Sequence, residues 1–197
     1  MNKFTKWFLT IGAKFACEKW WPFWSNIRWH KAIRTNIEIL DTDKVKTVSE
    51  ARQLVSKVYK KFTWTKDGAD QLWDSITPPP QNYQNYLDGE IKDDCDGFHS
   101  TIYHFLYNSD LECYLLSVIA RGCSHCVLIF KLGKSWYVDD YDKVYNGFST
   151  IEAAIEDYNT KYIQMYTTKS EVYYNSLTKF DYEKGKFKNQ PFKEIKD

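Results

Sequence analysis

The feature that most constrains the fold is a change of hydrophobic period between residues 95 and 140. Apolar residues first recur at helical spacing, at Phe98, Ile102, Phe105 and Leu106. The period then falls to two over residues 112–120, 125–132 and 135–140, and only Gly133 and Lys134 separate the last two segments. Strands with such short connections pair antiparallel. The sequence therefore predicts an α+β fold in which a helix over about residues 95–107 packs on an antiparallel sheet.

Length and charge limit the other classes of protein. The chain has 197 residues, 43% of them hydrophobic, with 27 Lys and Arg against 26 Asp and Glu. This composition is typical of one globular domain with an appended segment, and it excludes disorder, collagen and coiled coil. The near-zero net charge argues against a nucleic-acid partner. No apolar run reaches the roughly 18 residues that cross a bilayer.

The N-terminal segment, residues 1–35, differs from the rest of the chain. It holds seven Lys and Arg against one acid, and five of the eight tryptophans. A stripe of Phe4, Phe8, Ile11 and Phe15 predicts a short amphipathic helix that ends before Pro22. The favoured interpretation is that these aromatic residues dock onto the protein body. The alternative is a helix that contacts a membrane surface or a partner protein.

Local signals divide the remainder, from residue 36 to 178, into further elements. Thr47 and Glu50 form a capping box that predicts a helix to about residue 61. Residues 67–94 contain three prolines and little periodicity, which predicts a long surface loop. Ser149 and Glu152 suggest a second capping box for a helix to residue 158, with strands over 162–167 and 171–177. The tail, residues 179–197, is predicted to be polar and loose.

Cys95 is the sharpest chemical signal in the chain. It stands in the first turn of the predicted helix, where backbone N–H groups and the helix dipole stabilise a thiolate. The neighbouring acids Glu90, Asp93, Asp94 and Asp96 oppose a negative charge there. A nearby imidazolium would settle this contest in favour of the thiolate.

His125 can supply that imidazole, because it begins the strand that follows the helix by one intervening strand. A carboxylate must then orient the ring. Asp139 and Asp140 end the next strand of the hairpin, fourteen and fifteen residues after His125, so one of them lies across from it. The residues thus predict a Cys–His–Asp triad.

These residues resemble the transglutaminase-like superfamily of papain-type cysteine enzymes, and most of all the bacterial transglutaminase-like cysteine peptidases. Three pieces carry the resemblance, in order over about residues 64–145: Asp94-Cys95-Asp96, His125-Cys126-Val127-Leu128 and Tyr137-Val138-Asp139-Asp140. The resemblance implies that residues 36–178 form a catalytic domain with a papain-like fold. It also selects Asp140 as the third member of the triad. It also implies a hydrolase that acts on a peptide or protein, as a thiol protease does, without a cofactor.

Two departures from the family pattern accompany the match. The family has Gly before its Cys and a Glu-Asp pair after it, whereas this chain has Asp94 before and Asp96-Gly97 after. Trp73 and Pro78 match an upstream Trp and a Pro-containing loop of the family. The oxyanion donors are then predicted to be the Cys95 backbone N–H and a side chain from Gln71 or Trp73.

Two hypotheses that do not involve a catalytic triad remain open. Cys95 and His99 lie one helical turn apart, and Cys123 and Cys126 form a Cys-x-x-Cys pair, so the four residues could hold a structural zinc ion. The chain could also be a binding module that has the fold without the chemistry. If the triad hypothesis holds, oxidation could form a disulfide between Cys123 and Cys95 and so inactivate the enzyme.

The cysteine count and the loop before Cys95 give two last expectations. The chain has five cysteines, an odd number in a protein too large to need disulfides, which favours a reducing compartment and a cytoplasmic location over secretion. Residues 67–94 run directly into the nucleophile. We expect this loop to lie over or beside Cys95 and to gate access to it.

Overall fold

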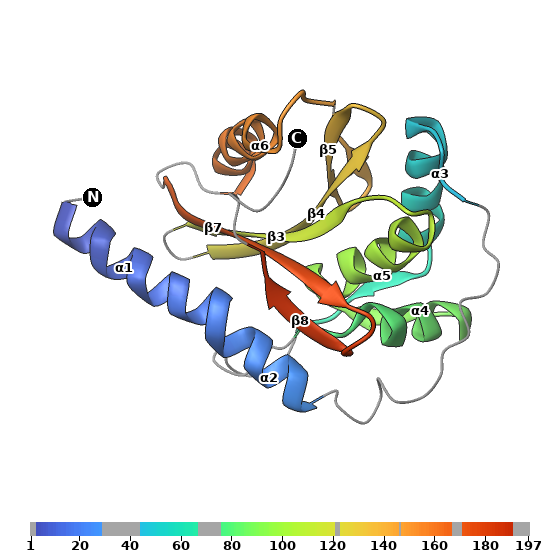
Figure 1. Cartoon of the computed structure of the whole chain (residues 1–197), viewed down its shortest axis with the longest axis horizontal. Coiled ribbons are helices and arrows are strands. Elements are labelled where there is room, and N and C mark those ends of the chain that lie inside the picture. The colour runs from blue at the N-terminus through green and yellow to red at the C-terminus, as the bar shows by residue number, and fades with distance from the viewer. Residues whose placement is uncertain are drawn as a thin grey trace.

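The computed structural model describes residues 3–28, 44–66, 76–120, 123–145, 147–166 and 171–190 (Figure 1). The helices are α1 (Lys3–Phe15), the π-helical turn η1 (Ala16–Trp20), α2 (Trp21–Arg28), α3 (Val48–Tyr59), α4 (Pro79–Leu87), α5 (Cys95–Asn108) and α6 (Ile151–Tyr166). The strands are β1 (Phe62–Trp64), β2 (Ile91–Asp93), β3 (Cys113–Ala120), β4 (Cys123–Leu132), β5 (Ser135–Asp140), β6 (Lys143–Val144), β7 (Val172–Asp181) and β8 (Lys186–Asn189).

The main sheet has six antiparallel strands in the order β6-β5-β4-β3-β7-β8. Its centre is the predicted meander, in which Leu115 pairs with Leu128 and Leu128 pairs with Asp139. A separate pair, β1 and β2, is parallel and leads into α5. The prediction of a mixed α+β fold with an antiparallel sheet is therefore confirmed.

The two faces of the sheet bury two different hydrophobic clusters, as the period of two requires. Leu115, Leu128 and Phe130 pack on the side of α3, α4 and α5. Leu116 and Val127 pack on the opposite side, against α6. Figure 1 shows α6 on one face of the sheet and α5 on the other. The result is a three-layer arrangement with the sheet in the middle.

The N-terminal helix continues through Pro22, where the sequence predicted an end. η1 precedes α2, and the Trp21 N–H bonds to the Ala16 carbonyl in the wider π-helical spacing. The wider π-helical turn lies directly before Pro22, which has no N–H to donate to the preceding turn. The stripe residues are exposed, Phe4 by 72%, so the favoured interpretation that they dock onto the body is wrong.

The segment before Cys95 is more regular than predicted. The capping box of Thr47 and Glu50 is present at the start of α3, as expected. Residues 67–75 lie outside the described residues, but α4 and β2 occupy most of the rest of the predicted loop. Pro79 and Pro80 begin α4, where prolines fit well, and Tyr83 is buried with 2% exposure.

The C-terminal part differs from the sequence prediction in three places. Thr150, instead of Ser149, caps α6, because its Oγ1 accepts a hydrogen bond from the Ala153 N–H at 3.2 Å. α6 reaches Tyr166 and replaces the strand predicted at 162–167. β7 confirms the strand predicted near 171–177, but β7 and β8 form a hairpin over residues predicted as a loose tail, and Phe180 and Phe187 are buried in it.

Within the described residues, no helix combines the length and apolar character that a bilayer crossing requires.

Candidate active site

The first turn of α5 holds Cys95 at the end of the short strand β2. Asp94 is the N-cap, and its carboxylate accepts a hydrogen bond from the Asp96 N–H at 3.1 Å. The N–H groups of this turn have no acceptor within the helix, so they favour a negative charge nearby. The Cys95 Sγ accepts a hydrogen bond from the Cys126 backbone N–H at 3.4 Å. Two elements, α5 and β4, therefore fix the position of the thiol.

Gly97 packs closely against the side chain of Asp93. A Cβ atom at this position would lie 2.0 Å from Cγ of Asp93, so only glycine fits without a shift of that side chain. Asp93 in turn accepts a hydrogen bond from the Asp94 N–H at 2.9 Å, and Asn82 on α4 donates to the Gly97 carbonyl at 3.1 Å. This packing locks the backbone that carries Cys95.

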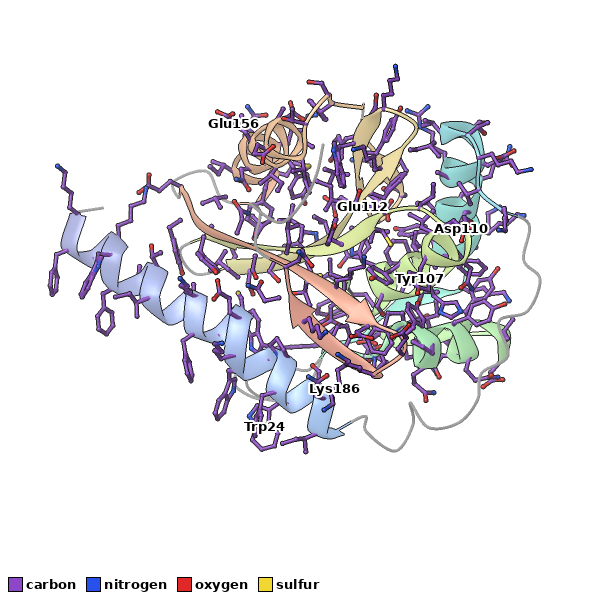
Figure 2. All side chains as sticks on the ribbon, in the orientation of Figure 1. Trp24, Tyr107, Asp110, Glu112, Glu156 and Lys186 are labelled. Atoms are coloured by element: carbon purple, nitrogen blue, oxygen red, sulfur yellow. The ribbon has the colours of Figure 1, made fainter. Side chains whose placement is uncertain are left out.

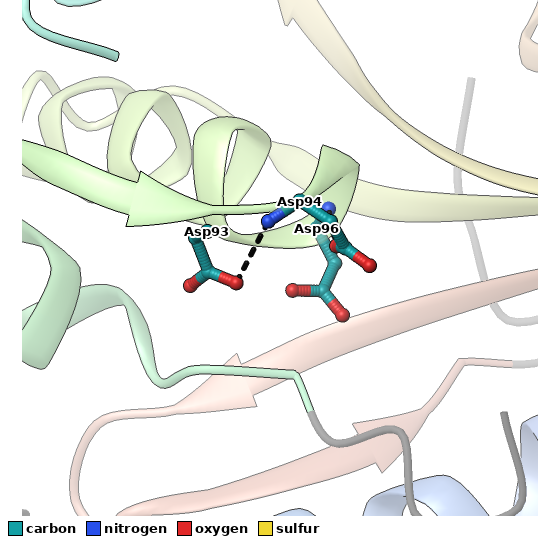
Figure 3. Close-up of side chains that lie close together, drawn as sticks. All are labelled: Asp93, Asp94 and Asp96. Carbon is teal, nitrogen blue, oxygen red and sulfur yellow. Dashed lines mark hydrogen bonds between the residues drawn. The ribbon is translucent and has the colours of Figure 1, made fainter. Parts of the chain in front are cut away.

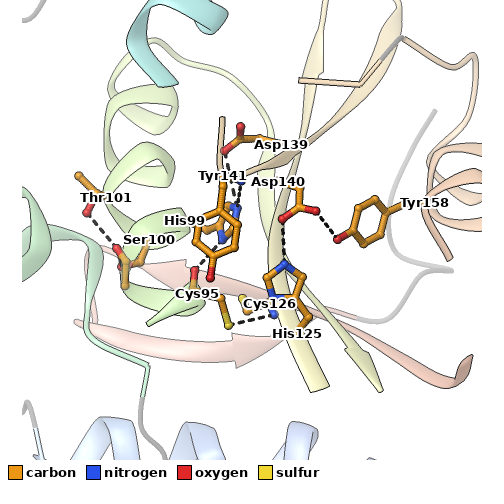
Figure 4. Close-up of polar contacts among 11 residues, drawn as sticks. Cys95, His99, Ser100, Thr101, His125, Cys126, Asp139, Asp140, Tyr141 and Tyr158 are labelled. Atoms are coloured by element: carbon orange, nitrogen blue, oxygen red, sulfur yellow. Dashed lines mark hydrogen bonds and ion pairs between the residues drawn. The ribbon is translucent and has the colours of Figure 1, made fainter. Parts of the chain in front are cut away.

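His125 and Asp140 form the polar pair beside the thiol (Figure 4). Nε2 of His125 donates a hydrogen bond to Oδ1 of Asp140 at 2.8 Å. The strand register accounts for this pair, because β4 and β5 place Leu128 opposite Asp139 and leave Asp140 on the same face as His125. The Tyr158 hydroxyl, from α6, donates to the other oxygen of Asp140 at 2.9 Å.

Two tyrosines hold the His125 ring. Tyr162 of α6 stacks on it at 5.9 Å between ring centroids, and Tyr141 lies against it at 5.6 Å. These contacts restrict rotation of the imidazole about the side-chain bonds that join it to the backbone. The hydrogen bond to Asp140 fixes which nitrogen carries the proton. Nε2 carries the proton that faces Asp140, and Nδ1 is the nitrogen that is left to accept a proton.

The pKa values of Cys95 and Asp140 are shifted in opposite directions. Burial raises the pKa of Cys95 well above its ordinary value, and the negative charges of Asp94 and Asp96 raise it further. For Asp140, burial also raises the pKa, but the hydrogen bond and charge of His125 outweigh it, so the pKa is lowered. The resting site thus holds a neutral thiol and an ionised carboxylate.

A small pocket of about 40 Å³ opens at these residues. Cys95, His125 and Cys126 line it together with Trp21 from α2 and Ile76 from the segment before α4. Its volume admits a few water molecules. The segment before α4 therefore lies beside Cys95, as the sequence predicted, while Tyr83 pins α4 itself to α5.

His99 and Asp139 lie next to the triad without belonging to it. Nδ1 of His99 donates to the Cys95 carbonyl at 2.6 Å, and Nε2 accepts from the Tyr141 N–H at 3.2 Å. Burial lowers the pKa of His99 to about 3, and burial raises that of Asp139 well above its ordinary value. Both side chains are therefore neutral at pH 7, even though Nε2 and Oδ2 are 3.9 Å apart.

These contacts disfavour the zinc hypothesis. Backbone groups occupy both nitrogens of His99, so this ring cannot act as a ligand without loss of one of these hydrogen bonds. Nor do Cys95, Cys123 and Cys126 belong to a convergent set of metal-ligating atoms over the described part of the chain.

The one such set found over that part of the chain is the acidic cluster of Asp93, Asp94 and Asp96 (Figure 3). Its carboxylate oxygens lie within 4.8 Å of one another. Asp93 and Asp94 each accept a backbone N–H at the start of α5, so the cluster serves as a cap for the helix.

The structure thus brings together three residues predicted from the sequence, Cys95, His125 and Asp140. Gln71 and Trp73, the predicted oxyanion side chains, lie outside the described residues. Sequence reasoning missed Tyr158, Tyr162 and the Cys126 N–H. The tyrosines gave a weak signal, because their spacing of four residues places them on one face of a helix, but a strand was expected at Tyr162.

Neither a scan against protein-family models nor a search of curated proteins finds a match to the chain.

Proposed function

We propose that this chain is a cysteine-dependent enzyme that transfers the acyl group of an amide, a peptidase or amidase with Cys95, His125 and Asp140 as its triad. The observation that carries the proposal is the 2.8 Å hydrogen bond between Asp140 and His125, which lines the same pocket as Cys95. The order Cys, His, Asp along the chain, on a helix start and two adjacent strands, agrees with the transglutaminase-like, papain-type fold that the sequence resembles.

The chemistry follows from the protonation states. The Cys95 Sγ attacks the carbonyl carbon of the amide while Nδ1 of His125 takes the thiol proton. Asp140 stabilises the imidazolium that forms, because it is ionised and bonded to Nε2. The imidazolium then gives the proton to the leaving amine as the C–N bond breaks, and a thioester with Cys95 remains.

The thioester is released by a second acyl transfer. A water molecule attacks the carbonyl carbon, Nδ1 of His125 accepts its proton, and the C–S bond breaks to give a carboxylic acid and the restored thiol. An amine in place of water gives transamidation, and a glutamine side chain as substrate gives deamidation. The oxyanion donors are the Cys95 backbone N–H with a side chain from Gln71 or Trp73.

Burial of the Cys95 thiol determines when its proton moves to His125. Because the pKa of Cys95 is raised, the proton must move to His125 during the attack and not before it. The Cys126 N–H and the first turn of α5 stabilise the sulfur as charge develops on it.

Thiol labelling tests the proposal. Because His125 accepts the thiol proton as the new bond to sulfur forms, iodoacetamide should label Cys95 of the full chain at pH 7.5 at least about tenfold faster than Cys123, which is similarly half-buried. Cys95→Ala should lose the fast label, and His125→Gln should reduce it to the rate of Cys123, as peptide mass mapping would show. A fast label that persists in Cys95→Ala would place the nucleophile elsewhere. Equal rates at Cys95 and Cys123 would instead support a binding module without catalysis.

A further inference from the structure

The N-terminal helix carries a large apolar surface that the protein body does not cover. Eleven large hydrophobic residues are exposed over the described part of the chain, and seven of them lie on α1 and α2. These seven form the apolar stripe: Phe4, Trp7, Phe8, Ile11, Phe15, Phe23 and Ile27. At roughly 150 to 250 Å² for an aromatic side chain, the stripe exposes on the order of 800 Å². The largest patch on an ordinary monomer is about 300 to 600 Å².

The opposite side of the same helix is firmly attached to the sheet. Cys17 is 3% exposed, and Ser25 is fully buried. Asn26 accepts a hydrogen bond from the Phe187 N–H on β8 at 2.9 Å, and Lys6 forms a salt bridge with Glu171 at 3.1 Å. Figure 2 shows a row of side chains on the side of α1 that faces away from the sheet. Packing of its small and polar face therefore directs the apolar stripe outward.

The charges next to the stripe have one sign. Lys3, Lys14 and Lys19 are exposed on α1 and η1. Glu18 is the one acid between residues 3 and 28, and it accepts a hydrogen bond from the Tyr174 hydroxyl. A second copy of this helix, packed stripe to stripe, would bring lysines close to lysines. An anionic lipid surface would instead complement both the lysines and the aromatic residues.

We propose that residues 3–28 bind the surface of a membrane that contains anionic phospholipids. The helix lies parallel to the bilayer plane, with the apolar stripe at the boundary between headgroups and acyl chains and with the lysines among the phosphates. Trp7 and the phenylalanines suit this boundary, which favours aromatic rings. This proposal does not depend on catalysis by Cys95.

Co-sedimentation of the full chain with vesicles tests the proposal. The chain should bind vesicles of phosphatidylcholine with 30% phosphatidylglycerol, and at least about tenfold more weakly vesicles of phosphatidylcholine alone, since three lysines contribute. The double variant Phe4→Ser/Phe8→Ser should bind the anionic vesicles at least about tenfold more weakly. The control Trp64→Ser removes a similarly exposed aromatic side chain, 59% exposed, from β1 and should bind like the wild type.

Two further measurements make the outcome decisive. Thermal unfolding shows whether the double variant Phe4→Ser/Phe8→Ser keeps its fold. If it is unfolded, the variant Lys3→Glu/Lys14→Glu takes its place, and it should bind anionic vesicles more weakly than the wild type. Size-exclusion chromatography with light scattering reports self-association without lipid. The proposal is overturned if the wild type does not bind anionic vesicles, or if the correctly folded double variant binds them equally well. A dimer that the double variant abolishes, without vesicle binding, would make the stripe a protein interface and would also overturn it.

Discussion

Asp139 and Asp140 are adjacent in the sequence and have opposite chemistry, because a strand directs successive side chains to opposite faces of the sheet. Asp140 lies on the face of α6, where His125 and Tyr158 bond both of its oxygens and its pKa is lowered. Asp139 is fully buried near His99, and burial raises its pKa well above the ordinary value. The first is a carboxylate that can orient a base, and the second is a neutral acid.

This difference predicts different effects of one substitution. Asp140→Asn should slow iodoacetamide labelling of Cys95 by about tenfold or more, towards the rate of Cys123, because the asparagine cannot stabilise the His125 imidazolium. Asp139→Asn should leave that rate within about twofold, since an amide has nearly the shape of the protonated carboxyl group. Labelling rates of the two variants at pH 7.5 check the prediction, which equal slowing of both would contradict.

Asp139→Asn also has a predicted effect on stability. The folded carboxyl group is protonated, whereas the unfolded one ionises near its ordinary pKa of 3.8. Stability from Asp139 is therefore present below that value and is lost as the pH rises towards the folded pKa. Urea unfolding at pH 6 and pH 8 should show a smaller loss for the variant than for the wild type.

At the scale of elements, the contact between α4 and α5 holds a second buried histidine. The His104 ring stacks on Tyr83 at 4.4 Å between centroids, and its Nδ1 lies 3.0 Å from the Tyr182 hydroxyl. Burial lowers the pKa of His104 to about 4. The contact therefore joins two helices and the β7–β8 hairpin around a neutral imidazole.

We predict that this contact makes the fold sensitive to acid. The unfolded His104 takes up a proton below about pH 6.5 and the folded one only below about pH 4, so its stabilisation is present above pH 6.5 and is lost as the pH falls to 4. The loss is about 1.4 kcal/mol per pH unit and about 3 kcal/mol in total. The pKa values of His99 and Asp139 shift in opposite directions, so their contributions to stability change with pH in opposite senses.

The variant His104→Phe isolates this effect, because phenylalanine keeps the stack on Tyr83 but cannot bind a proton. The free energy of unfolding in urea, measured from pH 7 to pH 4.5, should fall less steeply with decreasing pH for the variant. Parallel curves for the variant and the wild type would show that His104 is not the titrating group.

At the scale of the whole molecule, the N-terminal helices pack against the C-terminal hairpin of the described chain. α1 and α2 lie along β7 and β8 (Figure 1), and β8 is an edge strand of the sheet. Asn26 bonds both backbone groups of Phe187 on that edge, at 2.9 Å to the N–H and 3.4 Å to the carbonyl. The amide side chain thus protects an edge that would otherwise offer unpaired groups.

Asn26→Leu should lower the free energy of unfolding by about 1 to 3 kcal/mol, because a backbone N–H in a partly buried contact loses its acceptor. Asn26→Asp keeps an acceptor for the same N–H and should cost less. Urea unfolding of the two variants beside the wild type measures this difference. An equal cost for both would indicate that volume, and not the hydrogen bond, matters at this position.

The sequence by itself determined the central part of the fold. The periods of 3.6 and 2 between residues 95 and 140 predicted α5 and the β3–β4–β5 meander with small boundary errors, and Thr47 with Glu50 predicted the start of α3. The same pattern predicted that Cys95, His125 and one of Asp139 and Asp140 lie close together, and the family resemblance selected Asp140. Such elements are predictable because their signals are local and agree with the pairing that short connections impose.

Other elements were decided by tertiary contacts. Residues 76–94 have weak periodicity, and α4 forms there because Tyr83 and Asn82 find buried partners on α5. Phe180 and Phe187 order a tail that is otherwise polar, because they pack on each other and on the core. No local signal records these distant partners.

The N-terminal helix shows most clearly which features follow from the sequence and which follow from tertiary packing. Its apolar spacing predicted a helix, and the sequence alone favoured burial of the aromatic face. The sheet instead receives the opposite face, where Cys17, Ser25 and Asn26 allow close approach and hydrogen bonds to β7 and β8. Periodicity determines which residues share a face, but only the shape and polarity of the surface that receives a helix decide which face is buried.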